Sequence, residues 1–155
     1  MTMREVEVVG VRVEMPTNQP LVLLRESEGS RYVPIWIGAV EASAIASAHQ
    51  GTETPRPLTH ELISRLVTAL GDELRRVDIV DVREGVFFAE LRFASGITVD
   101  ARPSDAIAVA LRCGAPLFCA EDVLEEAGIF ATDEEEQVVE QFREFLDEVD
   151  PEDFA

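Results

Sequence analysis

The sequence predicts an α+β fold with a mainly antiparallel sheet, built from duplicated strand-strand-strand-helix units and followed by an additional C-terminal amphipathic helix. Three observations predict it. Charged and apolar residues alternate from Glu5 to Glu14, as in a half-buried strand. Short apolar runs on either side of turn residues occur in both halves of the chain. The segment 41–46 (EASAIA) resembles 105–110 (DAIAVA), 64 residues later, so Glu41 and Asp105 are expected to be equivalent.

The first half contains the elements of one such unit. Two apolar runs, Leu21–Leu24 and Tyr32–Ile37, are separated by the turn sequence SEGS and predict a hairpin. An alanine-rich helix is expected over Val40–His49, ending at Gly51. A loop with two prolines then leads to a second helix, which Thr59 would cap and which would run to about residue 70.

The second half repeats this plan. Strands are expected over Val77–Val82, Val86–Phe93 and Ile97–Ala101, before a helix that ends at Cys113. Pro103 and Ser104 stand where a helix start favours a proline and a capping hydroxyl. Further elements are expected over 117–119, a short strand, and 121–127, a short helix. We place the domain at 1–130 and an acidic, helical C-terminal tail at 131–155, where apolar residues recur at helical spacing from residue 138.

Composition indicates a soluble protein of one domain, expected in the cytoplasm. The chain has 155 residues, no apolar run long enough to span a bilayer, and two cysteines that form no metal or disulfide pattern. We therefore expect no membrane association and interpret both cysteines as packing groups. The formal net charge is −18, and residues 121–155 hold 15 of the 31 acidic residues. A field of this sign repels polyanions, so contact with nucleic acid needs a local arginine cluster or bound cations.

Two segments concentrate the chemically useful side chains. Residues 55–62 (PRPLTHEL) and 100–110 (DARPSDAIAVA) each combine an arginine, an acid and a helix start. Together they contribute Arg56, His60, Glu61, Asp100, Arg102 and Asp105.

These two segments, with 34–38 (PIWIG) and 87–90 (FFAE), resemble the bifunctional nuclease family. The resemblance extends over about 3–128 and leaves out the acidic tail. Glu61 stands where the family more often has aspartate. The resemblance implies an α+β domain, homo-oligomers with a dimer favoured, and an ability of some members to degrade both DNA and RNA.

Phosphodiester hydrolysis needs an activated water and neutralisation of charge at phosphorus. Carboxylates that hold a divalent ion can supply both, and arginines bind the phosphate oxygens. Our hypothesis is a metal-assisted nuclease in which Asp100, Asp105 and Glu41 hold Mg²⁺ or Mn²⁺ and serve catalysis. Arg56 and Arg102 would hold phosphate, and His60 would act either as the base or as a hydrogen-bond donor to phosphate. The hypothesis requires segments 55–62 and 100–105 to meet.

Structural explanations remain open for the same residues. An acid in the first turn of a helix stabilises the helix dipole without binding anything, and this applies to Glu41 and Asp105. Asp100 and Arg102 would share one face of an extended strand and could form an ion-pair network. Ser104 is most simply a helix cap, and Trp36 is expected in the core. The alternatives to a nuclease are a non-enzymatic module that binds an anion or an acidic partner, and an oligomeric scaffold.

Overall fold

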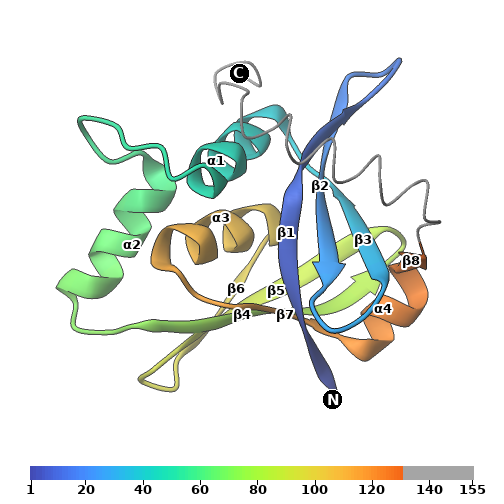
Figure 1. Cartoon of the computed structure of the whole chain (residues 1–155). Coiled ribbons are helices and arrows are strands. Elements are labelled where there is room, and N and C mark those ends of the chain that lie inside the picture. Colours follow the sequence, from blue (N-terminus) through green and yellow to red (C-terminus); the bar gives the residue numbers. More distant parts are fainter. Residues whose placement is uncertain (131–155) are drawn as a thin grey trace.

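The computed structural model describes residues 1–130, in which helices and strands follow the predicted order (Figure 1). The acidic tail at 131–155, with the helix predicted there, lies outside this part of the chain. The elements are β1 (Met3–Glu14), β2 (Gln19–Glu26), β3 (Arg31–Trp36), α1 (Ala39–His49), α2 (Thr59–Ala69), β4 (Leu74–Arg83), β5 (Val86–Phe93), β6 (Thr98–Ala101), α3 (Pro103–Cys113), β7 (Leu117–Ala120), α4 (Glu121–Ala127) and β8 (Ile129–Phe130).

Within residues 1–130, the strands form one sheet in the order β6-β5-β4-β7-β1-β2-β3-β8. Two antiparallel meanders, β1-β2-β3 and β4-β5-β6, lie on either side of β7. β7 pairs antiparallel with β1 and parallel with β4, so it joins the two meanders into a single sheet. The mainly antiparallel α+β fold predicted from the sequence is therefore confirmed.

Each meander is followed by a helix, as the predicted duplication requires. α1 and α3 each have eleven residues, begin 64 residues apart and pack side by side (Figure 1). Residues at this offset are buried alike: Ala42 and Ala106 are fully buried, and Ile45 and Val109 are at most 2% exposed. Small alanine side chains let the two helices approach closely, and the helices bring their first turns to the same end of the domain.

The main hydrophobic core joins both units. It combines β-branched and leucine side chains of both meanders with the buried faces of α1 and α3. Ile45 and Ile107, one from each helix, are fully buried. Burial of such a side chain stabilises the fold by about 1.5–3 kcal/mol. The two helices are thus fixed against the sheet, and their first turns are held in place.

The helix starts differ from those predicted. The residue before α2 is Leu58, and that before α3 is Arg102, so Thr59 and Ser104 lie inside their helices and do not cap them. Pro103 takes the first helical position, where its missing N–H costs nothing. None of the described helices has a side-chain cap, so the first N–H groups of α1 and α3 have no such partner.

Trp36 corrects another expectation. It ends β3 opposite Leu21 and is 54% exposed, whereas its neighbours Ile35 and Ile37 are buried. Side chains alternate across a strand, so the two isoleucines take the core face and direct the indole to the other side. Apolarity alone does not decide burial at a strand end, and Trp36 is a surface residue.

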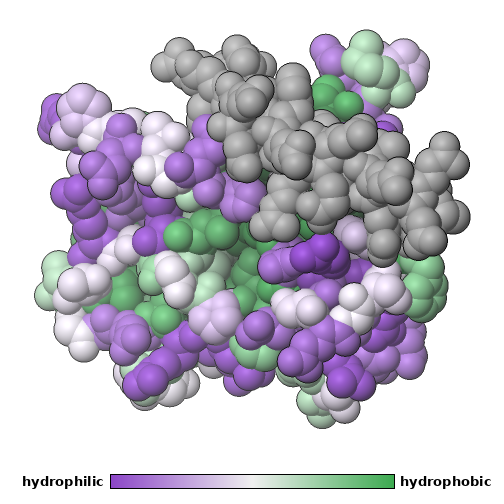
Figure 2. All heavy atoms as spheres, viewed as in Figure 1, coloured by the Kyte–Doolittle hydropathy of each residue, from purple (hydrophilic) through white to green (hydrophobic). Residues whose placement is uncertain are grey.

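The face of the molecule in Figure 2 is mostly hydrophilic, with apolar surface gathered near its middle, where α3 and β1 lie in Figure 1. Of the helices within residues 1–130, none has the length and apolar character needed to cross a membrane.

Candidate functional site

Arg102 stands between the first turns of α1 and α3. Its Nη2 donates to Oε1 of Glu41 at 2.9 Å, and its Nε donates to Oδ2 of Asp105, also at 2.9 Å. Glu41 and Asp105 are the third residues of their helices, so the duplication places two equivalent carboxylates around one guanidinium. The residue at the position equivalent to Arg102 in the first unit is Gly38, which precedes α1. One arginine therefore serves both carboxylates.

His60 joins the same cluster from α2. Its Nε2 lies 3.0 Å from Oδ1 of Asp105, and its side chain is 14% exposed. The carboxylate can only accept, so the Nε2–H of His60 donates. The two predicted segments, 55–62 and 100–105, thus meet as the sequence hypothesis required. We call Glu41, His60, Arg102 and Asp105 the helix-start site.

The site combines one guanidinium with two carboxylates, so with a neutral His60 its formal charge is −1. Partial burial raises the pKa of Asp105, but the hydrogen bonds from His60 and Arg102 outweigh it and hold this pKa below its ordinary value. The hydrogen bonds to Asp105 and then to Glu41 raise the pKa of Arg102. Asp105 is therefore ionised at neutral pH and accepts from both neighbours at once.

The other predicted site residues lie apart from this cluster. Asp100 is exposed on β6, opposite Glu90 of β5, and makes no ion pair within residues 1–130. It does not form the predicted network with Arg102, because β6 ends at Ala101 and the chain turns into α3. Arg56 is exposed in the loop before α2, where its carbonyl oxygen accepts from the Thr54 hydroxyl.

A resident divalent ion fits this arrangement poorly. Glu41 and Asp105 face a guanidinium in the position between them, and Asp100 lies elsewhere. Across residues 1–130, no three or more His, Cys, Asp or Glu side chains are grouped so that they could hold a metal ion. The predicted metal requirement stays a prediction.

Arg112, near the end of α3, braces the loop that leads to His60. Its Nη1 donates to the carbonyl oxygen of Thr52 at 2.8 Å, and its Nη2 donates to Oγ of Ser47 at 3.0 Å. The sequence analysis missed this residue. A basic residue in the last turn of a helix ordinarily indicates only a dipole interaction, so no local pattern identifies its partners.

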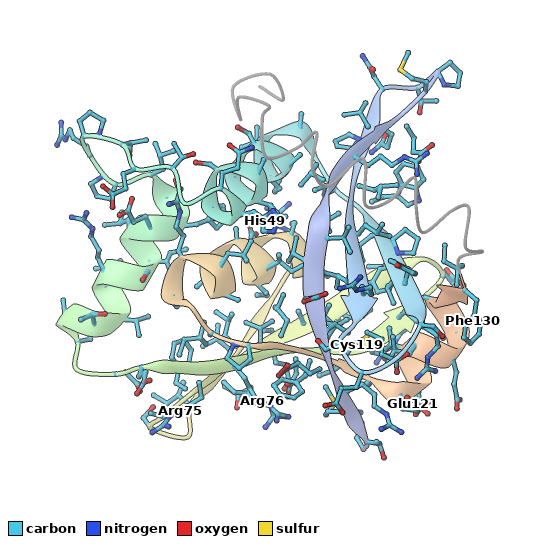
Figure 3. The ribbon with its side chains drawn as sticks, in the orientation of Figure 1. His49, Arg75, Arg76, Cys119, Glu121 and Phe130 are labelled. Atoms are coloured by element: carbon cyan, nitrogen blue, oxygen red, sulfur yellow. The ribbon has the colours of Figure 1, made fainter. Side chains whose placement is uncertain are left out.

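A second charged cluster lies on the side of β4 away from α3, where Figure 3 labels Arg76. The carboxylate of Asp78 is 1% exposed and pairs with Nε of Arg92 at 2.6 Å and with Arg76 Nη2 at 3.0 Å. Nε of Arg76 is also within 2.9 Å of this carboxylate but lacks hydrogen-bond geometry. The Arg76 guanidinium lies over the ring of Phe118, 4.5 Å from its centre. The two arginines of this cluster neutralise a buried acid.

The structure thus defines an α+β domain with a polar site of arginine, histidine and carboxylate at the start of its two paired helices. The chain belongs to the bifunctional nuclease domain family, whose sequence model matches residues 22–132.

Similar proteins include both uncharacterized and named relatives. The uncharacterized protein Rv1829 of Mycobacterium tuberculosis is 55% identical over 161 aligned residues, which cover 98% of each chain. Bifunctional nuclease 2 of Oryza sativa subsp. japonica is 29% identical, over 64% of this chain and 33% of the relative. Bifunctional nuclease 1 of Arabidopsis thaliana is 26% identical, over 63% of this chain and 32% of the relative. The aligned region is therefore about a third of each plant protein.

Proposed function

We propose that this protein hydrolyses phosphodiester bonds in DNA and RNA at the helix-start site. The observation that carries the proposal is the hydrogen-bonded chain from His60 through Asp105 to Arg102, in a domain of the bifunctional nuclease family. A base and a phosphate-binding cation are both required for this reaction, and here they share one carboxylate.

His60 is the base of the proposed reaction. Because Asp105 accepts the Nε2 proton, the neutral ring keeps its lone pair on Nδ1. This nitrogen takes a proton from the attacking water as the water oxygen bonds to phosphorus, and Asp105 stabilises the imidazolium that forms. The P–O bond to the leaving sugar oxygen breaks, and that oxygen takes up a proton from solvent. Asp105 is a positioning residue in this step, because it acts through the ring.

Arg102 is the phosphate-binding group. Its Nε and Nη2 are occupied by the two carboxylates, which leave the Nη1 hydrogens available, and 66% of its side chain is exposed. Guanidinium donors bind phosphate oxygens well. Arg56 is exposed in the loop before α2 and is assigned a second phosphate contact.

The opposing proposal is a non-enzymatic module that binds an anion. The two carboxylates paired with Arg102 favour this module over a nuclease. Their negative charge weakens the attraction of a polyanion such as DNA or RNA. Anion binding without hydrolysis would support this alternative.

Self-association through α2 is a further part of the proposal. Four leucines spaced by four residues, Leu58, Leu62, Leu66 and Leu70, are 46–83% exposed, and α2 has no buried residue. This leucine stripe is symmetric about Ser64. A second copy related by a two-fold axis that passes between Leu62 and Leu66, on the exposed side of α2, would bring Leu62 against Leu66 and cover both stripes. We therefore assign a dimer, with α2 at its interface.

The location assigned to the protein is the cytoplasm. Both cysteines are free, as expected in a reducing compartment. Fractionation of cells that produce the tagged chain checks this assignment.

The test of the nuclease proposal is a cleavage assay with labelled DNA and RNA, run with Mg²⁺, with Mn²⁺ and with a chelator. His60→Gln is expected to lower the rate about 10²–10⁴-fold, because it removes the base. Arg102→Lys is expected to weaken substrate binding, since lysine cannot bind two groups in a fixed plane. Arg65→Lys is the matched control, because Arg65 is 63% exposed and lies outside the site.

Cleavage at the wild-type rate by His60→Gln would refute the assignment of the base. Loss of activity in the chelator alone would confirm the metal requirement predicted from the sequence, and unchanged activity would contradict it.

A further inference from the structure

We infer that a groove beside the helix-start site binds single-stranded nucleic acid, with unpaired bases on Trp36 and Phe88 and the intervening phosphate at Arg102. The inference rests on the proposed function and names the form of its substrate. It also gives a role to the sequence 34–38 (PIWIG), which the catalytic proposal leaves unused.

The groove consists of two adjoining hollows. One, of about 350 Å³, is lined by Trp36, Gly38 and Ser104, and the other, of about 510 Å³, by Phe88 and Asp100. Both hollows are also lined by Val86, Phe87 and Arg102, so they lie next to each other on the two sides of these residues. Their volumes are in the range of small-ligand sites. The groove therefore extends from one exposed aromatic ring to another and passes Arg102 between them.

Both aromatic rings are accessible at the surface of the groove. Trp36 is 54% exposed and Phe88 is 42% exposed. The guanidinium of Arg83 lies 5.1 Å from the centre of the Phe88 ring, and its Nε is paired with Asp81 at 2.7 Å, so this end of the groove carries a paired basic group. Aromatic side chains beside basic groups stack on bases without selecting their sequence.

The middle of the groove offers hydrogen-bond donors for a phosphate. α1 and α3 both begin there, after Gly38 and Arg102, and neither has a side-chain cap. The first N–H groups of a helix favour anions. Glu41 opposes this, but its carboxylate is paired with Arg102.

Ser104 gives an independent indication of a ligand. Only 7% of this residue is exposed, its hydroxyl has no hydrogen-bond partner within residues 1–130, and it lines the hollow beside Arg102. The hydroxyl oxygen is not among the fully buried unpaired atoms of residues 1–130, so it is accessible from the hollow, where it can donate to an oxygen of a bound phosphate.

The recognition mode excludes a regular duplex as the preferred ligand. Stacking on a side chain requires the face of a base to be free, and in a duplex both faces are covered by neighbouring bases. A single strand presents these faces directly. The groove is thus selective for unpaired segments of DNA or RNA.

The test measures binding separately from cleavage. Trp36 is the one tryptophan of the chain, so a short thymidine oligomer is expected to change the intrinsic fluorescence, while a blunt duplex of the same length changes it much less. Anisotropy of a labelled oligomer, at low salt with chelator, gives Kd for the variants. Trp36→Leu and Phe88→Leu are each expected to raise Kd about tenfold, and Ser104→Ala by a smaller factor.

Phe130→Leu is the matched control, because Phe130 is 72% exposed and does not line the groove. Equal Kd values for oligomer and duplex, an unchanged Kd in Trp36→Leu, or the absence of binding would each overturn the inference. If the oligomer binds as expected but no condition gives cleavage, the nuclease proposal is refuted and the inferred binding groove is supported. If Trp36→Leu and Phe88→Leu bind and cleave as the wild type does while His60→Gln is inactive, the inferred groove is refuted and the nuclease proposal is supported.

Discussion

The leucine stripe of α2 leads to a quantitative prediction for the double variant Leu62→Gln/Leu66→Gln. The two side chains are 46% and 51% exposed. Full burial of a leucine is worth about 1.5–3 kcal/mol, so covering the remaining half is worth about 1 kcal/mol. Two leucines on each of two protomers then stabilise the proposed dimer by about 4 kcal/mol. The double variant is expected to raise the dimer Kd about 10³-fold.

Sedimentation equilibrium over a range of protein concentrations measures this Kd. Glutamine and leucine have similar helix propensities, so α2 should still form, which circular dichroism checks. Val40→Gln is the control, since Val40 is 76% exposed on α1, outside the stripe. A wild-type protein that stays monomeric at all concentrations, or a double variant with the wild-type Kd, would refute the assigned interface.

Three further predictions concern charge and burial. Asp78→Asn is expected to lower the free energy of unfolding by about 1–3 kcal/mol. This is less than the loss for a fully buried ion pair, because Arg92 reaches solvent. Urea unfolding measures the change, and an unchanged free energy of unfolding would contradict the structural role of Asp78. The hydrogen bond from Arg31 holds the pKa of Glu26 below its ordinary value, so this stabilisation is present above the ordinary pKa and is lost as pH falls through the lowered pKa. Thermal unfolding across acidic pH should therefore vary less in Glu26→Gln than in the wild type, and equal pH profiles would contradict this. Burial raises the pKa of Cys119 to about 12, so its thiol should resist alkylation at mildly alkaline pH until the protein unfolds. Mass spectrometry identifies the alkylated cysteine. Rapid alkylation of Cys119 in the native protein would contradict its burial.

The sequence predicted the order of elements well, because each unit combines period-two alternation with a compact alanine-rich helix. The 64-residue offset correctly placed Glu41 and Asp105 as equivalents. It did not reveal that Arg102 lies between them, since this depends on the packing of α1 against α3. The spacing of residues within one segment does not predict which side chains of distant segments come into contact.

Other errors have equally specific causes. Thr59 and Ser104 suit a helix cap chemically, but α2 begins at Thr59 itself and α3 begins one residue before Ser104, so both residues lie inside the first turn. Trp36 was expected in the core on its apolar character, whereas strand alternation directs it outward. The groove was not predicted, because its aromatic rings come from separate elements and match no sequence motif.

The two equivalent helix starts carry different residues, and this difference has a consequence for directionality. Two identical halves would present the same groups to a chain entering from either end. Here Gly38 precedes one helix and Arg102 the other, so the 5′ and 3′ sides of the proposed nucleic-acid backbone would meet different surroundings. The internal symmetry of the fold is therefore broken at the surface of the groove.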